Sequence, residues 1–178
     1  MGEYMRIDTA RPLSAERRDE INRQAVPLLE ATCESPIEQQ MLAALCVVIT
    51  GRPNTMLTIM DRDEVFPEDD DELGITGTSE QAVWIYPQCR IGSYRADFVV
   101  VWTRDPARVH HVVVECDGFE FHGQNKAQFV RDRVRDRIMR YVGLTVLRFS
   151  GSEIYADRSQ CAHNVFEYLE SRDRLEVR

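Results

Sequence analysis

The sequence HHVVVECDGFEFH, from His110 to His122, decides the fold of this chain. Its valines are typical of a buried strand, yet the strand ends in two carboxylates, Glu115 and Asp117, that are one residue apart. Ionised carboxylates are costly to bury unless a cation or hydrogen-bond donors accompany them. The stretch therefore indicates a functional site at the end of a strand.

The segments around this stretch predict a single α/β domain. Four central strands are expected, at 82–90, 94–102, 110–116 and 144–149, with one short further strand at 55–60. Helices are expected at 14–30, 35–49, 125–141 and 158–172. The fold class is therefore α/β, with a mixed central sheet of about four strands flanked by helices. The domain is expected over 35–178, after a helical extension at 1–34 and with an acidic insertion at about 52–79.

Two helices carry clear start or stop signals. Ser35 suits the N-cap of the helix at 35–49, Pro36 suits its first position, and Glu38 completes an S-x-x-E capping box. The helix at 125–141 is expected to end at Gly143. Its apolar positions recur every three or four residues, at Ala127, Val130, Val134, Ile138 and Tyr141.

The strand pair 94–102 and 110–116 makes a geometric prediction. A hairpin turn centred on Pro106 places Asp97 opposite Glu115, with their Cβ atoms about 5 Å apart on the same face of the sheet. Alternation puts Asp117 on that face and Cys116 on the other. Asp97, Glu115 and Asp117 are therefore expected to cluster at one end of the sheet, and a slip of one residue would separate them.

Three interpretations of this cluster stay open. Carboxylates this close raise one another's pKa unless a cation is present. That cation is either a hard divalent ion, Mg²⁺ or Mn²⁺, or an arginine such as Arg95 or one from the helix at 125–141. A solvated strand end is the remaining alternative.

Charge is distributed unevenly along the chain. The net charge is -8, but residues 61–72 hold eight acids against one arginine, whereas residues 123–148 hold seven basic residues against two aspartates. Lys126, Arg133, Arg137 and Arg140 fall on nearly one side of the second of these segments, a helix. They form either a solvated face or a surface for a polyanion. The acidic segment would suit a basic protein partner.

Composition bounds the remaining possibilities. The chain of 178 residues has no apolar run long enough to span a bilayer, so no membrane association is expected. Its five cysteines lie far apart without a CxxC pair. This pattern is typical of reduced thiols in a cytoplasmic protein and argues against a disulfide framework or a zinc ribbon.

Four segments together resemble a known superfamily: SPIEQQMLAAL, YRADFVVVW, VVVECDGFEFH and RDRVRDRIMRYVGLTVLRF. In this order they resemble the PD-(D/E)XK nucleases, and most of all the very-short-patch-repair-like endonuclease branch with an E-x-D-G-x-x-H motif. The resemblance spans residues 35–150. It implies a restriction-endonuclease-like core with the element order α-β-β-β-α-β.

The resemblance also implies metal ligands. Asp97 matches the first metal-binding aspartate, although the preceding residue is Ala96 rather than proline. Glu115 matches the second acidic ligand, and the carbonyl of Cys116 stands where a third ligand often lies. The implied cofactor is Mg²⁺ or Mn²⁺.

Further catalytic positions follow from the same resemblance. Asp117 stands where the superfamily name expects lysine, which the branch commonly replaces with aspartate, and His122 matches the branch's histidine. His122 is then a candidate general base, and Lys126 is the alternative group near the reacting phosphate. Glu38 matches the N-terminal helical glutamate, although its capping role explains it equally well.

The implied function is metal-dependent hydrolysis of nucleic-acid phosphodiester bonds, with DNA favoured over RNA. Lys126, Arg131, Arg135 and Arg148 are candidate phosphate contacts, and Arg148 would otherwise pair with a carboxylate. One alternative is an inactive nuclease-fold module that binds nucleic acid, a protein partner or a second copy of the chain. Another is an unrelated α/β protein with a carboxylate-lined pocket for a small molecule.

Overall fold

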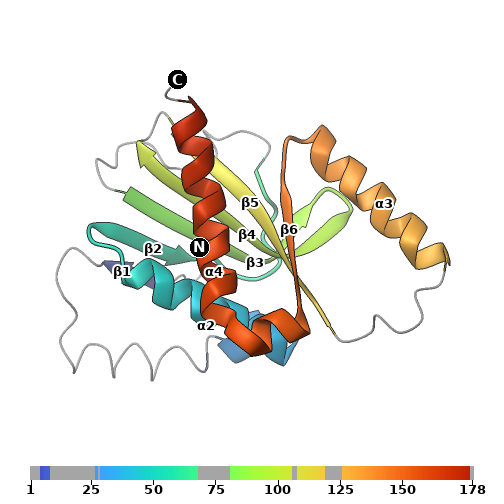
Figure 1. Ribbon diagram of the computed structural model, residues 1–178, viewed down its shortest axis with the longest axis horizontal. Helices are drawn as coiled ribbons and strands as arrows, with labels where there is room; N and C mark the ends of the chain where they lie inside the picture. Colours follow the sequence, from blue (N-terminus) through green and yellow to red (C-terminus); the bar gives the residue numbers. More distant parts are fainter. Residues whose placement is uncertain are drawn as a thin grey trace.

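A computed structural model describes residues 5–8, 27, 29–67, 81–105, 108–118 and 126–176, with backbone alone for 5–8 and 126–132. Its strands are β1 (Met5–Asp8), β2 (Thr55–Ile59), β3 (Gln81–Ile91), β4 (Tyr94–Asp105), β5 (Arg108–Asp117) and β6 (Val146–Ser150). Its helices include α2 (Pro36–Thr50), α3 (Lys126–Tyr141) and α4 (Gly151–Glu176), which is interrupted by a non-helical residue, Asp157. Figure 1 shows their arrangement.

The described strands form one mixed sheet of six, in the order β1-β2-β3-β4-β5-β6. Pairs β2–β3 and β5–β6 are parallel, and the other pairs are antiparallel. The predicted α/β class with a mixed, helix-flanked sheet is confirmed. The four expected central strands are β3, β4, β5 and β6, and the short strand expected at 55–60 is β2.

The N-terminal region differs from the expectation. Residues 5–8 form β1, an edge strand beside β2, where a helical extension was predicted over 1–34. Residues 29–32 are helical, as expected from that region, and the rest of the helix predicted at 14–30 lies almost wholly outside the described residues. The first described residues of the N-terminal region, 5–8, therefore belong to the sheet.

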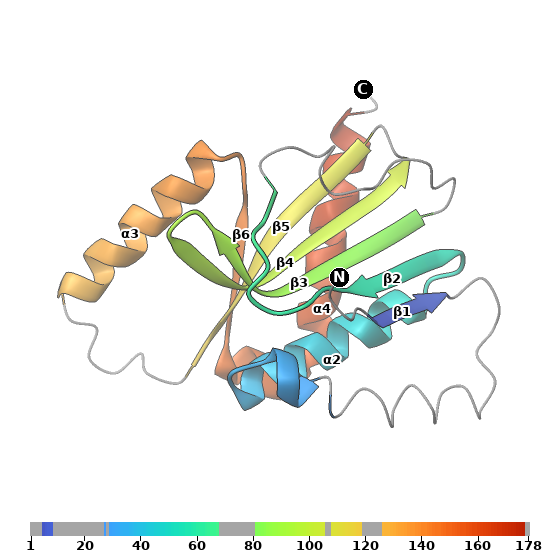
Figure 2. The ribbon, with the colours of Figure 1, turned by 180° about the vertical axis from the view of Figure 1, so that it is seen from behind.

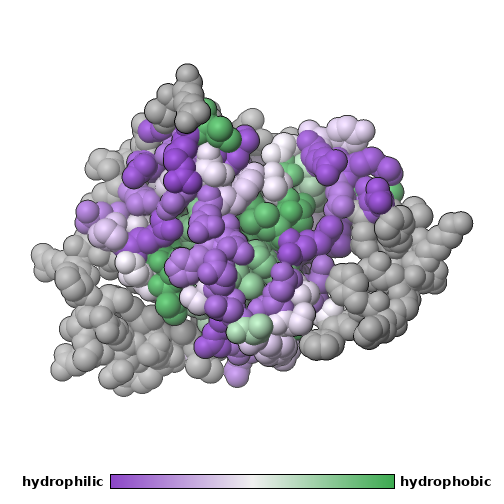
Figure 3. All heavy atoms as spheres, viewed as in Figure 1, coloured by the Kyte–Doolittle hydropathy of each residue, from purple (hydrophilic) through white to green (hydrophobic). Residues whose placement is uncertain are grey.

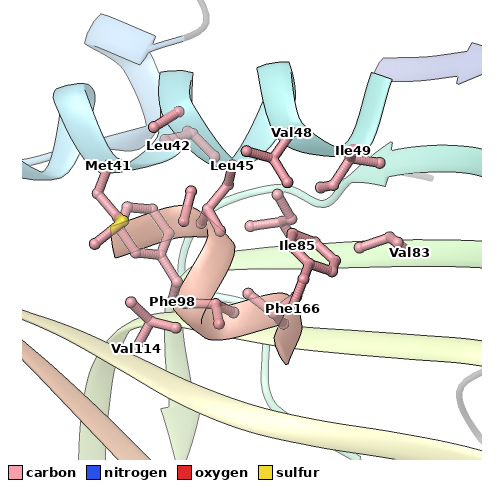
Figure 4. Close-up of a cluster of buried hydrophobic side chains, with 14 of the residues drawn as sticks. Met41, Leu42, Leu45, Val48, Ile49, Val83, Ile85, Phe98, Val114 and Phe166 are labelled. Carbon is pink, nitrogen blue, oxygen red and sulfur yellow. The ribbon is translucent and has the colours of Figure 1, made fainter. Parts of the chain in front are cut away.

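Helices α2 and α4 cover one face of the sheet (Figure 1 and Figure 4). Figure 4 shows Met41 and Leu45 of α2 pointing toward Phe98 of β4, Val114 of β5 and Phe166 of α4. All five side chains are almost completely inaccessible to solvent. Burial of apolar area on this scale is the main source of stability in such a domain. It also fixes the position of α2 relative to the ends of β4 and β5.

The opposite face has a second apolar layer, which includes Trp84, Val99 and Val113 of the sheet. Met139 of α3 and Leu144 pack against this layer, and both views place α3 beside β6, at the edge of the sheet (Figure 2). Figure 3 shows that the outer side of α4 is mostly hydrophilic. None of the described helices is long and apolar enough to cross a membrane.

The stop predicted for α3 is confirmed, but its apolar positions do not form its buried side. Gly143 has a positive φ of 75°, its N–H bonds to the Arg140 carbonyl, and the Leu144 N–H bonds to the Met139 carbonyl, which is a Schellman motif. Val134 and Ile138 are 40% and 39% exposed, whereas Met139 is fully buried. The apolar period was misleading because α3 turns Met139, rather than Val134 and Ile138, toward the sheet.

The register of the β4–β5 hairpin is the one predicted. Phe98 pairs with Val114, and the same register continues to the pair Thr103–Val109. The next position toward the site brings Asp97 beside Glu115. Both strands run further toward the turn than expected, with an irregularity between Thr103 and Asp105.

Candidate active site

Glu38 is fixed at the start of α2 by hydrogen bonds to both of its carboxylate oxygens. Ser35 is the N-cap, and its hydroxyl accepts from the Glu38 N–H at 3.3 Å and donates to Glu38 Oε1 at 2.7 Å. Oε2 accepts from the Glu34 N–H at 2.7 Å and from Gln88 Nε2 at 2.8 Å. The predicted capping box is confirmed, with one difference: the backbone N–H that donates to the Glu38 carboxylate is that of Glu34 rather than that of Ser35.

Gln88 is a neighbour of the site that the sequence interpretation missed. It lies on β3 with a φ of 51°, and its bond to Glu38 ties that strand to α2. The β3–β4 hairpin turns at Gly92, and its register pairs Cys89 with Ala96. Reading that turn in the sequence would have placed Gln88 opposite Asp97.

Asp97 and Glu115 meet at the end of the β4–β5 hairpin. The Cys116 N–H donates to Asp97 Oδ2 at 2.7 Å, so the Asp97 side chain bridges to the strand that carries Glu115. Glu115 is 4% exposed. Its Oε1 atom is fully buried and has no hydrogen-bond partner in the structure. A buried carboxylate oxygen without a donor is an unfavourable arrangement that a bound cation would relieve.

Both acids titrate abnormally. The pKa of Asp97 is raised to about 7, mainly by burial and also by the negative charges of Glu115, Glu38 and Asp117, while the hydrogen bond from the Cys116 N–H lowers it. Burial also raises the pKa of Glu115, although the Tyr94 hydroxyl, Arg135 and Arg148 oppose that shift. The site therefore holds more negative charge than the surrounding protein neutralises.

Arg135 of α3 is the arginine that reaches Glu115. Its Nη1 atom lies 3.4 Å from Glu115 Oε2 and donates to the Tyr94 hydroxyl at 3.0 Å. Its guanidinium carbon lies 4.9 Å from the centre of the Tyr94 ring, in cation–π geometry. This contact supports the expectation that an arginine of this helix neutralises the acids. Arg95 instead pairs with Glu34 at 2.6 Å and with Asp63 at 3.6 Å.

Arg148 of β6 is held by a different acid. Its two terminal nitrogens lie 2.5 Å and 3.4 Å from the two carboxylate oxygens of Asp136, in a two-point ion pair. That partner lowers the pKa of Asp136. The expectation that Arg148 pairs with a carboxylate or a phosphate is met by Asp136. Tyr94 and Asp136 were not singled out from the sequence, because nothing local indicates which helix residue reaches which strand.

The remaining predicted residues differ in how far the structure describes them. Asp117 ends β5 beside Ser150 of β6 and is partly buried. Cys116 packs against the core under α2 and α4, so it points away from the acids as predicted. His122 lies outside the described residues, and Lys126 and Arg131 lie on the part of α3 whose side chains are not described.

The side chains at this site supply two carboxylates as donors for a metal ion. In the described part of the chain, no group of three or more His, Cys, Asp or Glu side chains is arranged to hold one. Asp97 and Glu115 do supply hard oxygen donors, with a solvent-inaccessible Glu115 oxygen that no donor meets. Mg²⁺ is commonly bound through one or two carboxylates together with waters, so this pair fits such an ion. The five cysteines are all free thiols in the structure.

The chain matches the model of a known family. The model of the restriction-endonuclease-like family REase_MTES_1575 matches residues 78–169, just over half of the chain. The matched range contains Asp97, Glu115, Asp117 and His122 but not Glu38. No curated protein and no solved structure matches the chain significantly.

Proposed function

Because the chain belongs to the restriction-endonuclease-like family REase_MTES_1575, we propose that it is a metal-dependent endonuclease that hydrolyses phosphodiester bonds in DNA. The observation that carries this proposal is the buried pair of Asp97 and Glu115, which lacks sufficient positive charge. The finer part of the proposal is membership in the very-short-patch-repair-like branch. Glu115, Asp117, Gly118 and His122 follow the order of its E-x-D-G-x-x-H motif, although three residues rather than two separate Gly118 from His122 in this chain.

Asp97 and Glu115, with the carbonyl of Cys116, are the proposed ligands of Mg²⁺ or Mn²⁺. Such an ion, when bound, polarises a phosphate oxygen and lowers the pKa of the attacking water. The high pKa of Asp97 supports this assignment, because a site that resists ionisation gains most from a divalent cation. The unpartnered Oε1 atom of Glu115 supports it independently.

His122 is the proposed general base. An imidazole with an ordinary pKa near 6.5 can accept a proton from water around neutral pH. Asp117 then orients His122 or binds a second ion, and Lys126 is the alternative group for stabilising charge on the phosphate. Glu38 is not a proposed metal ligand, because protein donors occupy both of its carboxylate oxygens. Its proposed role is electrostatic, since its negative charge raises the pKa of Asp97.

We assign the DNA backbone to the exposed side of α3. Arg133, Arg137 and Arg140 are exposed there, and phosphate contacts of this kind give affinity without sequence preference. Lys126 and Arg131 belong to the same basic helix and are proposed as further phosphate contacts. Arg148 is a weaker candidate than the sequence suggested, because Asp136 already binds its guanidinium.

The test is a cleavage assay on plasmid DNA, single-stranded DNA and RNA, with Mg²⁺, Mn²⁺ or EDTA. We expect DNA cleavage that requires the metal and that is lost in Asp97→Ala and Glu115→Ala. Glu167→Gln is the matched control, because Glu167 is an exposed acid on α4. Cleavage that survives in both site variants would refute the proposed site.

One observation favours a second candidate, an inactive nuclease-fold module that binds nucleic acid or a protein partner. Arg135 already supplies a positive charge at Glu115, and Asp117 stands where the superfamily name expects lysine. Calorimetric titration separates the two. DNA binding together with no Mn²⁺ binding and no cleavage would favour the module.

A further inference from the structure

Among the residues that the structure describes, Arg135 supplies the positive charge in direct contact with Glu115. That contact does not engage both carboxylate oxygens of Glu115. It joins one nitrogen to one carboxylate oxygen at 3.4 Å, near the limit for a hydrogen bond, and it leaves Glu115 Oε1 without a donor. A guanidinium that binds a carboxylate strongly uses two parallel hydrogen bonds. Arg135 therefore neutralises Glu115 without occupying the carboxylate fully.

Arg148 shows what a permanent pair looks like in the same molecule. It meets both oxygens of Asp136 and has a nearest distance of 2.5 Å. Arg135 has a shorter contact to the Tyr94 hydroxyl, at 3.0 Å, than to Glu115, and it also lies over the Tyr94 ring. Its position would consequently be maintained by Tyr94 even when its contact with Glu115 is lost.

A divalent cation at Asp97 and Glu115 would place a second positive charge beside the Arg135 guanidinium. The two cations would compete for the same carboxylate, because like charges repel at short range in a partly buried site. The Oε1 atom of Glu115, which is buried and has no hydrogen-bond donor, is an oxygen ligand that the Arg135 contact does not use.

We propose that Arg135 is a displaceable counter-ion of Glu115, which holds the site in the metal-free protein and lowers its affinity for the divalent cation. The inference rests on the proposed metal site. Arg135 is thus a positioning residue that sets how readily the site loads. Once displaced from Glu115, its guanidinium is available to a DNA phosphate, which is the role that the sequence suggested for it.

The experiment is a calorimetric titration of Mn²⁺ into the wild-type chain, Arg135→Gln, Arg137→Gln and Glu115→Gln. Arg137 is the matched control, because it is an exposed arginine two residues along the same helix. We expect Arg135→Gln to bind Mn²⁺ about tenfold more tightly, within the range by which neighbouring groups alter metal affinity. Arg137→Gln should match the wild type, and Glu115→Gln should bind poorly.

Near-UV circular dichroism of the wild type with Mg²⁺ gives a second readout that does not depend on the stability of Arg135→Gln. We expect the near-UV signal to change on Mg²⁺ addition, because Arg135 shifts relative to the Tyr94 ring. This Mg²⁺-dependent change should be absent in Tyr94→Phe. Equal or weaker Mn²⁺ binding by Arg135→Gln than by Arg137→Gln would overturn this inference and leave the proposed function intact. No Mn²⁺ binding by any of the four proteins would overturn both.

Discussion

The two ends of the β4–β5 hairpin each bury a carboxylate, and they neutralise it in opposite ways. At the turn end, Asp173 of α4 is 3% exposed and has Arg108 at 3.0 Å, His110 at 3.5 Å and Arg104 at 3.6 Å. At the other end, Glu115 is buried to the same degree, but its contacts are the Tyr94 hydroxyl and a long ion pair to Arg135 at 3.4 Å, and it shares its surroundings with Asp97.

We propose that this difference separates a structural acid, Asp173, from a functional one, Glu115. The arginines at Asp173 join α4 to both strands of the hairpin without any added ion. The acids at Glu115 have fewer cations around them, and the high pKa of Asp97 follows from burial together with the negative charges of its neighbours. Asp173 is equally buried and its Oδ1 atom also lacks a hydrogen-bond donor among the described residues, so the feature that distinguishes the proposed site is the smaller number of cations around Glu115.

The largest expected effect is on catalysis at the charge-deficient end. Glu115→Gln should lower DNA cleavage on the order of 10³-fold, because even a partner behind a metal ligand is worth about 10–100-fold and a ligand is worth more. The free energy of unfolding should stay the same or rise slightly, because the substitution removes a poorly neutralised buried charge. Single-turnover cleavage together with thermal melting measures both. Cleavage within a few-fold of the wild type would place the chemistry elsewhere.

The second expected effect is on stability, at the turn end of the hairpin where cations surround Asp173. Asp173→Ala should lower the free energy of unfolding by about 3 kcal/mol, because it removes one side of a buried ion cluster and leaves the cations without their acceptor. Urea denaturation gives this value. Cleavage per folded molecule should stay unchanged, since Asp173 lies at the opposite end of the hairpin. An unfolding free energy equal to that of the wild type would show that the cluster does not hold α4.

A third effect concerns pH in the absence of metal. The pKa of Asp97 rises from 3.8 unfolded to about 7 folded, so the folded state binds this proton more tightly than the unfolded state does. The corresponding stability is present below about pH 4 and is lost as pH rises through 7. Asp97→Asn removes that loss and should be more stable than the wild type by about 4 kcal/mol near pH 8, because a shift of about three pKa units is worth about 1.4 kcal/mol per unit.

Denaturation in EDTA at several pH values tests this third prediction. The stabilising effect of Asp97→Asn should shrink toward zero near pH 4. Asp63→Asn serves as the control, because Asp63 is a more exposed acid paired with Arg62 and Arg95. A difference between Asp97→Asn and the wild type that does not vary with pH would contradict the charge deficit at this end.

The smallest expected effect is at Glu38. This acid resembles Asp173 in having donors from the protein, and it resembles Glu115 in lying near Asp97. Glu38→Ala should lower the free energy of unfolding by about 1 kcal/mol, because the start of α2 loses its capping bonds. Its effect on cleavage should be smaller than that of Glu115→Gln, since protein donors already occupy Glu38. Parallel melting and cleavage measurements test this. A loss of cleavage as large as that of Glu115→Gln would make Glu38 a full member of the catalytic site.

Much of the site could be predicted because its geometry depends on local rules. The β4–β5 hairpin fixes which residues face each other, so Asp97 and Glu115 could be paired from their spacing around Pro106. The capping box at Ser35 and the stop at Gly143 were equally local. These features need only the chain on either side of them.

The parts that could not be predicted depend on distant contacts. Four residues at 5–8 form a strand only because β2 offers them an edge, and nothing in their own sequence requires it. Arg135 and Arg148 looked equivalent in the sequence, yet one contacts Glu115 and the other Asp136. Which partner each arginine meets follows from where α3 lies relative to β6.

Asp97 and Glu115 are proposed to bind a divalent cation together, and a crystal structure of the chain grown with Mn²⁺ would show whether they do. We expect an anomalous peak between a carboxylate oxygen of Asp97 and Oε1 of Glu115, with the Arg135 guanidinium moved away from Glu115. An ordered site without a peak, with Arg135 still against Glu115, would contradict this proposal.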